Sequence, residues 1–184
     1  MIELEQARRS YLSHFRESIQ RNKDQHEKFA SEILLELSDS PNLYRNLFRV
    51  DMIYSNEGKN TVLEANIDNP TEFHKKEENY KGTTLSLNPI VWNGIDLTAN
   101  PKKQIEVESW FLKWADIEDA NPSDEDGFGG TIHSLSIENI GDPLTRYSID
   151  FGSARVEALY ELIDLLVSGE SSLIEICSSH LEIE

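Results

Sequence analysis

Apolar residues recur every three to four positions along the N-terminal segment of the chain. This spacing is typical of a helix with one buried face, and it predicts helix over residues 3–37. Residues 20–28 are entirely polar, which leaves open one long helix with a solvated middle or two helices that meet near residues 22–24. Ser38-Asp39-Ser40-Pro41 then ends the helical region. The apolar positions are Leu4, Tyr11, Leu12, Phe15, Ile19, Phe29, Ile33, Leu34 and Leu37.

The middle of the chain alternates between apolar and polar residues, which indicates strands. Alternation over residues 48–54 and 63–67, joined by the turn-forming residues 56–60, predicts a β-hairpin. Residues 69–82 are polar and are expected to form an exposed loop. Asn93-Gly94 favours the tight turn of a second hairpin. Helical spacing over 103–115 predicts a helix, and a loop rich in Asp, Glu, Pro and Gly follows it.

The C-terminal third predicts a strand over residues 147–151, a helix over 156–167 and a last strand over 173–176. The short connections leave open a parallel right-handed crossover or an antiparallel arrangement of this strand–helix–strand unit. The complete pattern predicts a single α+β domain over residues 1–184. It has a helical region over 1–38, and residues 39–184 form a mainly antiparallel sheet with packed helices. The strands of that sheet are expected within 39–102 and 131–177.

Acidic residues dominate the C-terminal part of the sequence. The chain has 17 Lys and Arg residues against 34 Asp and Glu residues, a formal net charge of −17. Residues 104–184 contain three positive and eighteen negative side chains, so this part alone carries −15. A field of this sign repels nucleic acids and anionic membrane surfaces, and it attracts a basic partner. The uneven distribution favours a basic partner over solubility as the whole explanation.

The sequence shows no membrane or secretory segment. No apolar run approaches the roughly 20 residues that span a bilayer. The first residues, Met1-Ile2-Glu3-Leu4-Glu5, are acidic and lack the apolar core of a signal peptide. Cys177 is the only cysteine, so no disulfide forms within the chain. We therefore expect a cytoplasmic protein that contacts neither membrane nor nucleic acid.

A run of acidic residues over 116–127 is the first candidate site. Clustered carboxylates suit hard cations, but an EF-hand register would place Pro122 and His133 at ligand positions, so that interpretation fails. A solvated loop, a looser cation site and a partner-docking surface remain. Trp114 and Phe128 flank the run as candidate anchors for a partner, although Trp110 and Trp114 fit a helix core better. The candidate partner-binding acids are Asp116, Glu118, Asp119, Asp124, Glu125 and Asp126.

His133 is the only residue whose position suggests catalysis, because it follows the acidic run. A small hydrolase that uses His133 with nearby carboxylates and a divalent cation is therefore an alternative hypothesis. Other motifs point away from chemistry. The five histidines lack metal-ligand spacing, Asp150-Phe151-Gly152 lacks the accompanying kinase motifs, and Cys177 lies in an apolar strand. We predict a binding protein rather than an enzyme, with no catalytic residue, no metal and no cofactor.

Four short motifs between residues 110 and 176 are Trp110-Phe111-Leu112-Lys113-Trp114, Asp126-Gly127-Phe128-Gly129-Gly130, Ile132-His133-Ser134 and Ile149-Asp150-Phe151-Gly152-Ser153-Ala154. Together they resemble the small acidic immunity proteins that bacteria encode beside polymorphic or contact-dependent toxins. The resemblance implies a protein that binds a cognate toxin domain and blocks its active site. Many such toxins are nucleases, whose basic grooves would attract a concentrated negative field. An acidic nucleic-acid mimic or adaptor that acts on a host protein is the third hypothesis.

Overall fold

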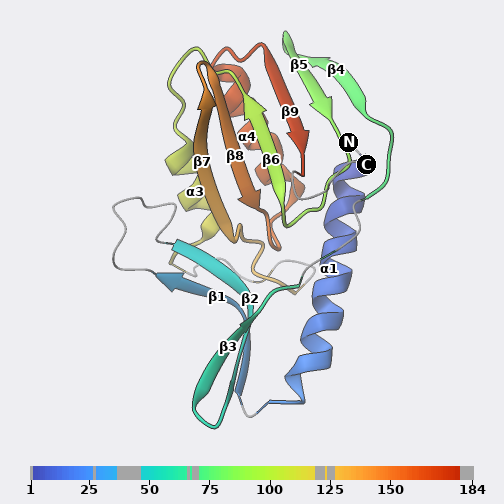
Figure 1. Cartoon of the computed structure of the whole chain (residues 1–184), viewed down its shortest axis with the longest axis vertical. Helices are drawn as coiled ribbons and strands as arrows, with labels where there is room; N and C mark the ends of the chain where they lie inside the picture. Colours follow the sequence, from blue (N-terminus) through green and yellow to red (C-terminus); the bar gives the residue numbers. More distant parts are fainter. Residues whose placement is uncertain are drawn as a thin grey trace.

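The computed structural model describes residues 2–26, 28–36, 47–65, 67, 71–118, 123 and 127–178. The elements within these ranges form a three-stranded sheet of order β1-β2-β3 and a six-stranded sheet of order β4-β5-β9-β6-β8-β7. Their bounds are α1 (Ile2–Lys23), β1 (Lys28–Glu36), β2 (Leu47–Asn56), β3 (Lys59–Leu63), β4 (Lys76–Tyr80), β5 (Thr83–Leu87), β6 (Ile95–Ala99), α3 (Val107–Ala115), β7 (Ser134–Gly141), β8 (Leu144–Asp150), α4 (Val156–Ser168) and β9 (Leu173–Cys177). The small sheet lies at one end of the large sheet, and α1 runs along the side of both (Figure 1).

The predicted α+β class is confirmed. Helices combine with mostly antiparallel sheets, the described chain begins with α1, and it ends with the strand–helix–strand unit β8–α4–β9. The expectation of a single sheet was wrong, because β2 and β3 belong to a separate small sheet. β1 pairs with β2 on one side, and β3 pairs on the other side only with Met52–Asn56. The first half of β2 therefore keeps an edge free, through which Arg49 N donates to His133 O.

The predicted helix over residues 3–37 was wrong beyond Lys23, and the helical region assigned to 1–38 contains a strand. α1 ends within the polar stretch, where Gln25 N donates to Asn22 O over 3.1 Å. The spacing of Phe29 and Ile33 fits a helix in isolation. β1 instead pairs antiparallel with β2, and the hydrogen bonds between the two strands satisfy its backbone groups. The sequence of this segment alone does not decide between helix and strand.

Two hairpins differ in their agreement with the sequence. A hairpin following residue 48 is confirmed as β2–β3, but its second strand is Lys59–Leu63 rather than the predicted 63–67, and residues 59–60 belong to the strand instead of the turn. A second hairpin, β4–β5, occupies part of the stretch expected to be a loop, so that expectation was wrong for Lys76–Tyr80. Its turn residues Lys81 and Gly82 have φ of 51° and 90°, as a tight hairpin turn requires. Asn93-Gly94 forms a turn before β6, but β6 pairs with β8 and β9 rather than with a strand across that turn.

The C-terminal unit resolves the alternative that the sequence left open. β6 lies between β8 and β9 and is antiparallel to both of them. β8 and β9 therefore run parallel to each other without being neighbours, and α4 connects them across one inserted strand.

One hydrophobic core links the two sheets and the helices. It includes Tyr11 and Phe15 of α1, Met52 of β2, Leu97 of β6 and Leu162 of α4, all of which are buried. The apolar face of α4 packs into this core, and α3 adds Trp110 and Phe111. Within the described part of the chain, no helix has the length and apolar character needed to cross a membrane.

Candidate functional site

The acidic surface predicted from the sequence is only partly placed by the structure. Asp116 ends α3 in a left-handed conformation, with φ of 45°, and only 8% of it is exposed. Its backbone carbonyl accepts a hydrogen bond of 2.9 Å from Arg49 Nη2. Glu118 is exposed. The remaining predicted acids, which lie outside the described residues, are Asp119, Asp124, Glu125 and Asp126.

The two aromatic residues predicted as anchors are engaged within the fold. Phe128 is buried, and its ring stacks on Phe15 of α1 with a centroid distance of 5.1 Å. Trp114 is half-buried, and its indole Nε1 donates to Glu161 Oε2 over 2.8 Å. Phe128 is a core residue in this conformation, whereas Trp114 borders the surface between α3 and α4.

His133, in contrast, occupies a position between the two sheets. This residue lies immediately before β7, and its backbone joins the two sheets. Its backbone N–H donates to Asp150 O over 2.9 Å, and its carbonyl accepts a bond of 2.7 Å from Arg49 N in β2. The side chain has no exposed surface. His133 is therefore fixed at the junction between the small and the large sheet.

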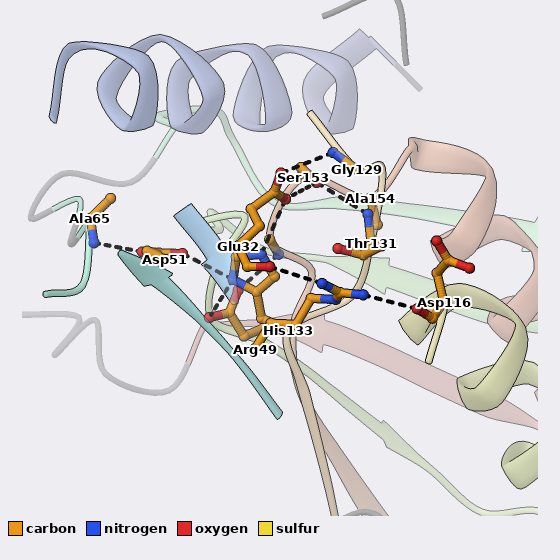
Figure 2. Close-up of polar contacts among 12 residues, drawn as sticks. Glu32, Arg49, Asp51, Ala65, Asp116, Gly129, Thr131, His133, Ser153 and Ala154 are labelled. Carbon is orange, nitrogen blue, oxygen red and sulfur yellow. Dashed lines mark hydrogen bonds and ion pairs between the residues drawn. The ribbon is translucent and has the colours of Figure 1, made fainter. Parts of the chain in front are cut away.

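Two carboxylates of the small sheet flank the imidazole ring. Glu32 of β1 lies between Ser31 and Ile33, which pair with Met52 and Val50 on either side of Asp51 in β2. The φ of Glu32, 51°, departs from strand geometry at this point. Glu32 Oε1 lies 3.4 Å from His133 Nε2, and Asp51 Oδ1 lies 2.9 Å from Nδ1 (Figure 2). Carboxylates on neighbouring strands of a sheet repel each other. The ring between them offsets that repulsion.

Further donors hold the two carboxylates in place. Asp51 accepts from the Tyr11 hydroxyl over 2.7 Å and from Ala65 N over 2.6 Å. Glu32 accepts from Gly129 N over 2.9 Å and from the Ser153 hydroxyl. These donors come from α1, from the segment after β3 and from the loops before β7 and α4. His133, Glu32 and Asp51 and the donors around them form one polar cluster, the His133 cluster. It connects α1, the small sheet and the loops that precede β7 and α4.

The turn that contains Asp150-Phe151-Gly152 closes the cluster from the large sheet. Asp150 Oδ2 lies 3.9 Å from His133 Nδ1, while Asp150 Oδ1 accepts from Gly152 N over 2.8 Å. Gly152 has φ of 46°, and a Cβ at this position would lie 2.1 Å from His133 Cδ2. The glycine is required both by its backbone conformation and by the ring that packs against it.

The cluster shifts the pKa values of its members in opposite directions. Burial alone would lower the pKa of His133, but Asp51 and Glu32 raise it to about 10. Burial opposes ionisation of these two carboxylates, yet the contacts with His133 bring the pKa of each below its usual value. Burial and the nearby Asp51 outweigh the attraction of His133 and raise the pKa of Asp150 to about 6. In the absence of a bound ion, His133 is an imidazolium held between two carboxylates.

This arrangement does not suit a general base. A base must lie within hydrogen-bond reach of the substrate and must be unprotonated. His133 is wholly buried and holds its proton, so it meets neither condition in this conformation. The cluster is instead placed to hold the sheets together or to bind an ion.

A groove on the surface lies between α3 and α4. Its volume is about 480 Å³, and Trp110 and Leu165 supply its apolar part. Glu157, Glu161 and Asp164 follow one another at helical spacing on α4, so they share one side of that helix. We call the groove together with Glu157 the α3–α4 face. The groove residues are Glu106, Ser109, Trp110, Lys113, Glu161, Asp164, Leu165 and Ser168.

Sequence reasoning singled out His133 but missed the residues that surround it. Its expected carboxylate neighbours were those of the preceding acidic run, whereas the observed ones are Glu32, Asp51 and Asp150. One signal was present: Arg49 and Asp51 occupy the polar side of β2, and the structure buries both. A strand with charged residues on a buried side points to a polar cluster within the core.

Comparisons with protein-family models, with curated proteins and with solved structures found no match to the chain.

Proposed function

We propose that this chain is an immunity protein that binds a cognate toxin domain carrying a basic surface, and that it neutralises the toxin by covering that surface. The observation that carries the proposal is the net charge of −15 concentrated in residues 104–184. The resemblance over residues 110–176 supports it and supplies the class of partner. Long-range attraction between opposite charges raises the rate of association, as rapid neutralisation of a toxin requires.

The α3–α4 face is the surface we assign to this partner. It combines an apolar floor with an acidic rim, the usual anatomy of a protein interface. Two of its acids are paired within the chain: Glu161 lies 2.7 Å from Lys113 Nζ, and Asp164 lies 2.7 Å from Lys81 Nζ. Exposed pairs of this kind contribute little, about 0–1 kcal/mol, so a basic partner can replace them at low cost.

The burial of His133 is the reason for proposing binding rather than hydrolysis. The hydrolase hypothesis requires His133 to reach a substrate, and its side chain has no exposed surface. The α3–α4 face, by contrast, is open to solvent, and a partner has to displace only the exposed side chains of Lys113 and Lys81 from its acids.

The first experiment is co-expression with the polypeptide encoded immediately upstream, followed by pull-down and a growth assay. We expect the upstream polypeptide to arrest growth alone, and this chain to bind it and restore growth. An upstream polypeptide that is harmless, or that this chain neither binds nor counteracts, would contradict the proposal. Capture of a host protein without any protection would favour the adaptor hypothesis instead.

A matched pair of charge-reversal variants tests the assigned surface. The first carries Glu106→Lys, Glu108→Lys and Glu157→Lys near the α3–α4 face, and the control carries Glu17→Lys, Glu57→Lys and Glu72→Lys elsewhere. All six residues are exposed, so both variants change the net charge equally without disturbing the core. We expect the first variant to raise the Kd for the toxin domain at least about tenfold and to flatten its salt dependence, and the control to do so much less. Equal effects of the two variants would rule out this face as the contact surface.

A further inference from the structure

Three potential metal ligands converge where the two sheets meet. Asp51 comes from β2, His133 from the segment before β7, and Asp150 from the end of β8. Each offers a ligand atom, and the three atoms lie within 4.8 Å of one another. Asp51 and His133 are buried, and 22% of the Asp150 side chain is exposed.

The surroundings of His133 Nδ1 are the most informative feature of this arrangement. It is buried, and among the described residues it has no aligned hydrogen-bond partner. Asp51 Oδ1 is close, at 2.9 Å, and Asp150 Oδ2 lies 3.9 Å away. The nitrogen therefore faces two carboxylate oxygens without a well-directed hydrogen bond to either. Around a tetrahedral ion with bonds of roughly 2.1 Å, ligand atoms lie about 3.4 Å apart, between these two separations.

The surrounding contacts match the outer shell of a metal site. A ligating histidine almost always places its other ring nitrogen against a carboxylate or carbonyl. Glu32 occupies that position, with Oε1 3.4 Å from Nε2. Donors also orient the two carboxylates: Tyr11 and Ala65 hold Asp51, and Gly152 N holds Asp150. The ligand atoms are therefore fixed before an ion arrives.

We propose that Asp51, His133 Nδ1 and Asp150 bind one divalent transition-metal ion, zinc or manganese, which joins the small sheet to the large sheet. One imidazole and two carboxylates suit either ion. The ion takes the place of the proton on Nδ1, and its two positive charges offset two of the three negative charges of Glu32, Asp51 and Asp150. The exposed edge of Asp150 gives it a route into the cluster.

The role of this ion is structural. His133 and Asp51 are buried and only 22% of the Asp150 side chain is exposed, so little of the ion is open to a substrate. The ligands come from strands of both sheets, so binding stabilises the junction between them. This inference does not depend on the proposed function, since a binding protein and an enzyme would be stabilised in the same way.

The test begins with the metal content of the full-length chain, expressed without a histidine tag in medium containing zinc and manganese, and dialysed against metal-free buffer. We expect about one ion per chain by mass spectrometry. Cobalt added to the chelator-treated protein should produce visible d–d absorption that saturates at one equivalent. Retention of no ion, together with no saturable cobalt spectrum, would overturn the proposal even if every variant failed to fold.

Variants separate this site from the acidic surface. Asp150→Asn keeps an acceptor for Gly152 N and removes a charged ligand, whereas the control Asp24→Asn removes an exposed carboxylate after α1. We expect zinc or manganese at a hundredfold excess over its Kd to raise the Tm of the natural chain and of Asp24→Asn by roughly 5–10 °C. In Asp150→Asn the rise should be largely lost, and the cobalt spectrum should weaken. An undiminished rise and spectrum in Asp150→Asn would place the ion on the surface acids and contradict the proposal.

Discussion

At the scale of single residues, Gly152 is a position where the fold leaves no room for a side chain. A Cβ there would lie 2.1 Å from His133 Cδ2, and the backbone has φ of 46°. Gly152→Ala should therefore combine left-handed strain with overpacking, and we expect it to lower the free energy of unfolding by about 3 kcal/mol or more. Urea unfolding followed by circular dichroism measures the change.

Gly58 provides the matched control for this prediction. It also has a positive φ, 77°, but a Cβ there would meet no atom within 4 Å. Gly58→Ala should therefore carry the backbone strain alone, about 1–2 kcal/mol. If the two substitutions cost the same, the ring of His133 does not restrict position 152.

His133 also shows how far sequence reasoning reaches at this scale. It was singled out for its nearness to acidic residues in the chain, but the carboxylates observed around it are contributed by β1, β2 and β8. Glu32 was assigned to a helix, so no spacing rule could have placed it on the strand beside Asp51. The contact depends on strand pairing, which single-sequence patterns do not encode.

At the scale of elements, α3 is attached to α4 by one buried hydrogen bond. The Trp110 indole Nε1 donates to Ala158 O over 2.9 Å, and the side chain is 4% exposed. Trp110→Phe removes the donor and part of the packing, so we expect it to lower the free energy of unfolding by about 2–3 kcal/mol.

Trp114 is the matched control on the same helix. Its Nε1 donates to Glu161 Oε2, but the side chain is only half-buried, and water can replace the lost donor. Trp114→Phe should cost less than about 1 kcal/mol in the same urea titration. The reverse order would mean that α3 is held by its outer side rather than by the core.

The elements differ in how well their patterns predicted them. α4 was predicted well because Val156, Leu159, Leu162, Ile163 and Leu166 form one apolar side over three turns, and the structure buries all five. β1 was missed because Ile33, Leu34 and Leu35 form a short apolar run that fits either period. The strand conformation of β1 is decided by hydrogen bonds to β2, which is a separate segment of the chain. Long periodic segments determine their own structure, whereas short ones depend on their neighbours.

At the scale of the whole molecule, the uneven charge is the feature that sequence alone revealed in full. The count of −15 in residues 104–184 is independent of the fold. Its placement was less predictable, since Asp116 is buried and Asp150 belongs to the His133 cluster. What the structure adds is the α3–α4 face, where part of that charge surrounds an apolar groove.

Such a charge makes the stability of the chain depend on salt. Repulsion among the exposed acids opposes folding, and a Debye length of roughly 30 Å at 0.01 M salt lets it act across the domain. At 0.15 M the length falls to roughly 8 Å, which removes most of the repulsion. The described ion pairs of Lys113 and Lys81 are exposed, so the attraction that salt would also screen in them adds little to the stability of the fold. We therefore expect the free energy of unfolding in urea to rise by an amount on the order of 1 kcal/mol between these two NaCl concentrations.

Neutralisation of exposed acids tests whether repulsion is the cause of that rise. A variant with Glu106→Gln, Glu108→Gln and Glu157→Gln removes three exposed charges from residues 104–184 and leaves the core intact. It should be more stable than the natural chain at 0.01 M NaCl and should gain less from added salt. Urea must be the denaturant, because guanidinium chloride would itself screen the charges. A natural chain that loses stability as NaCl is added would show that attraction between paired charges outweighs repulsion. In that event, the negative field would be a weaker argument for a basic partner.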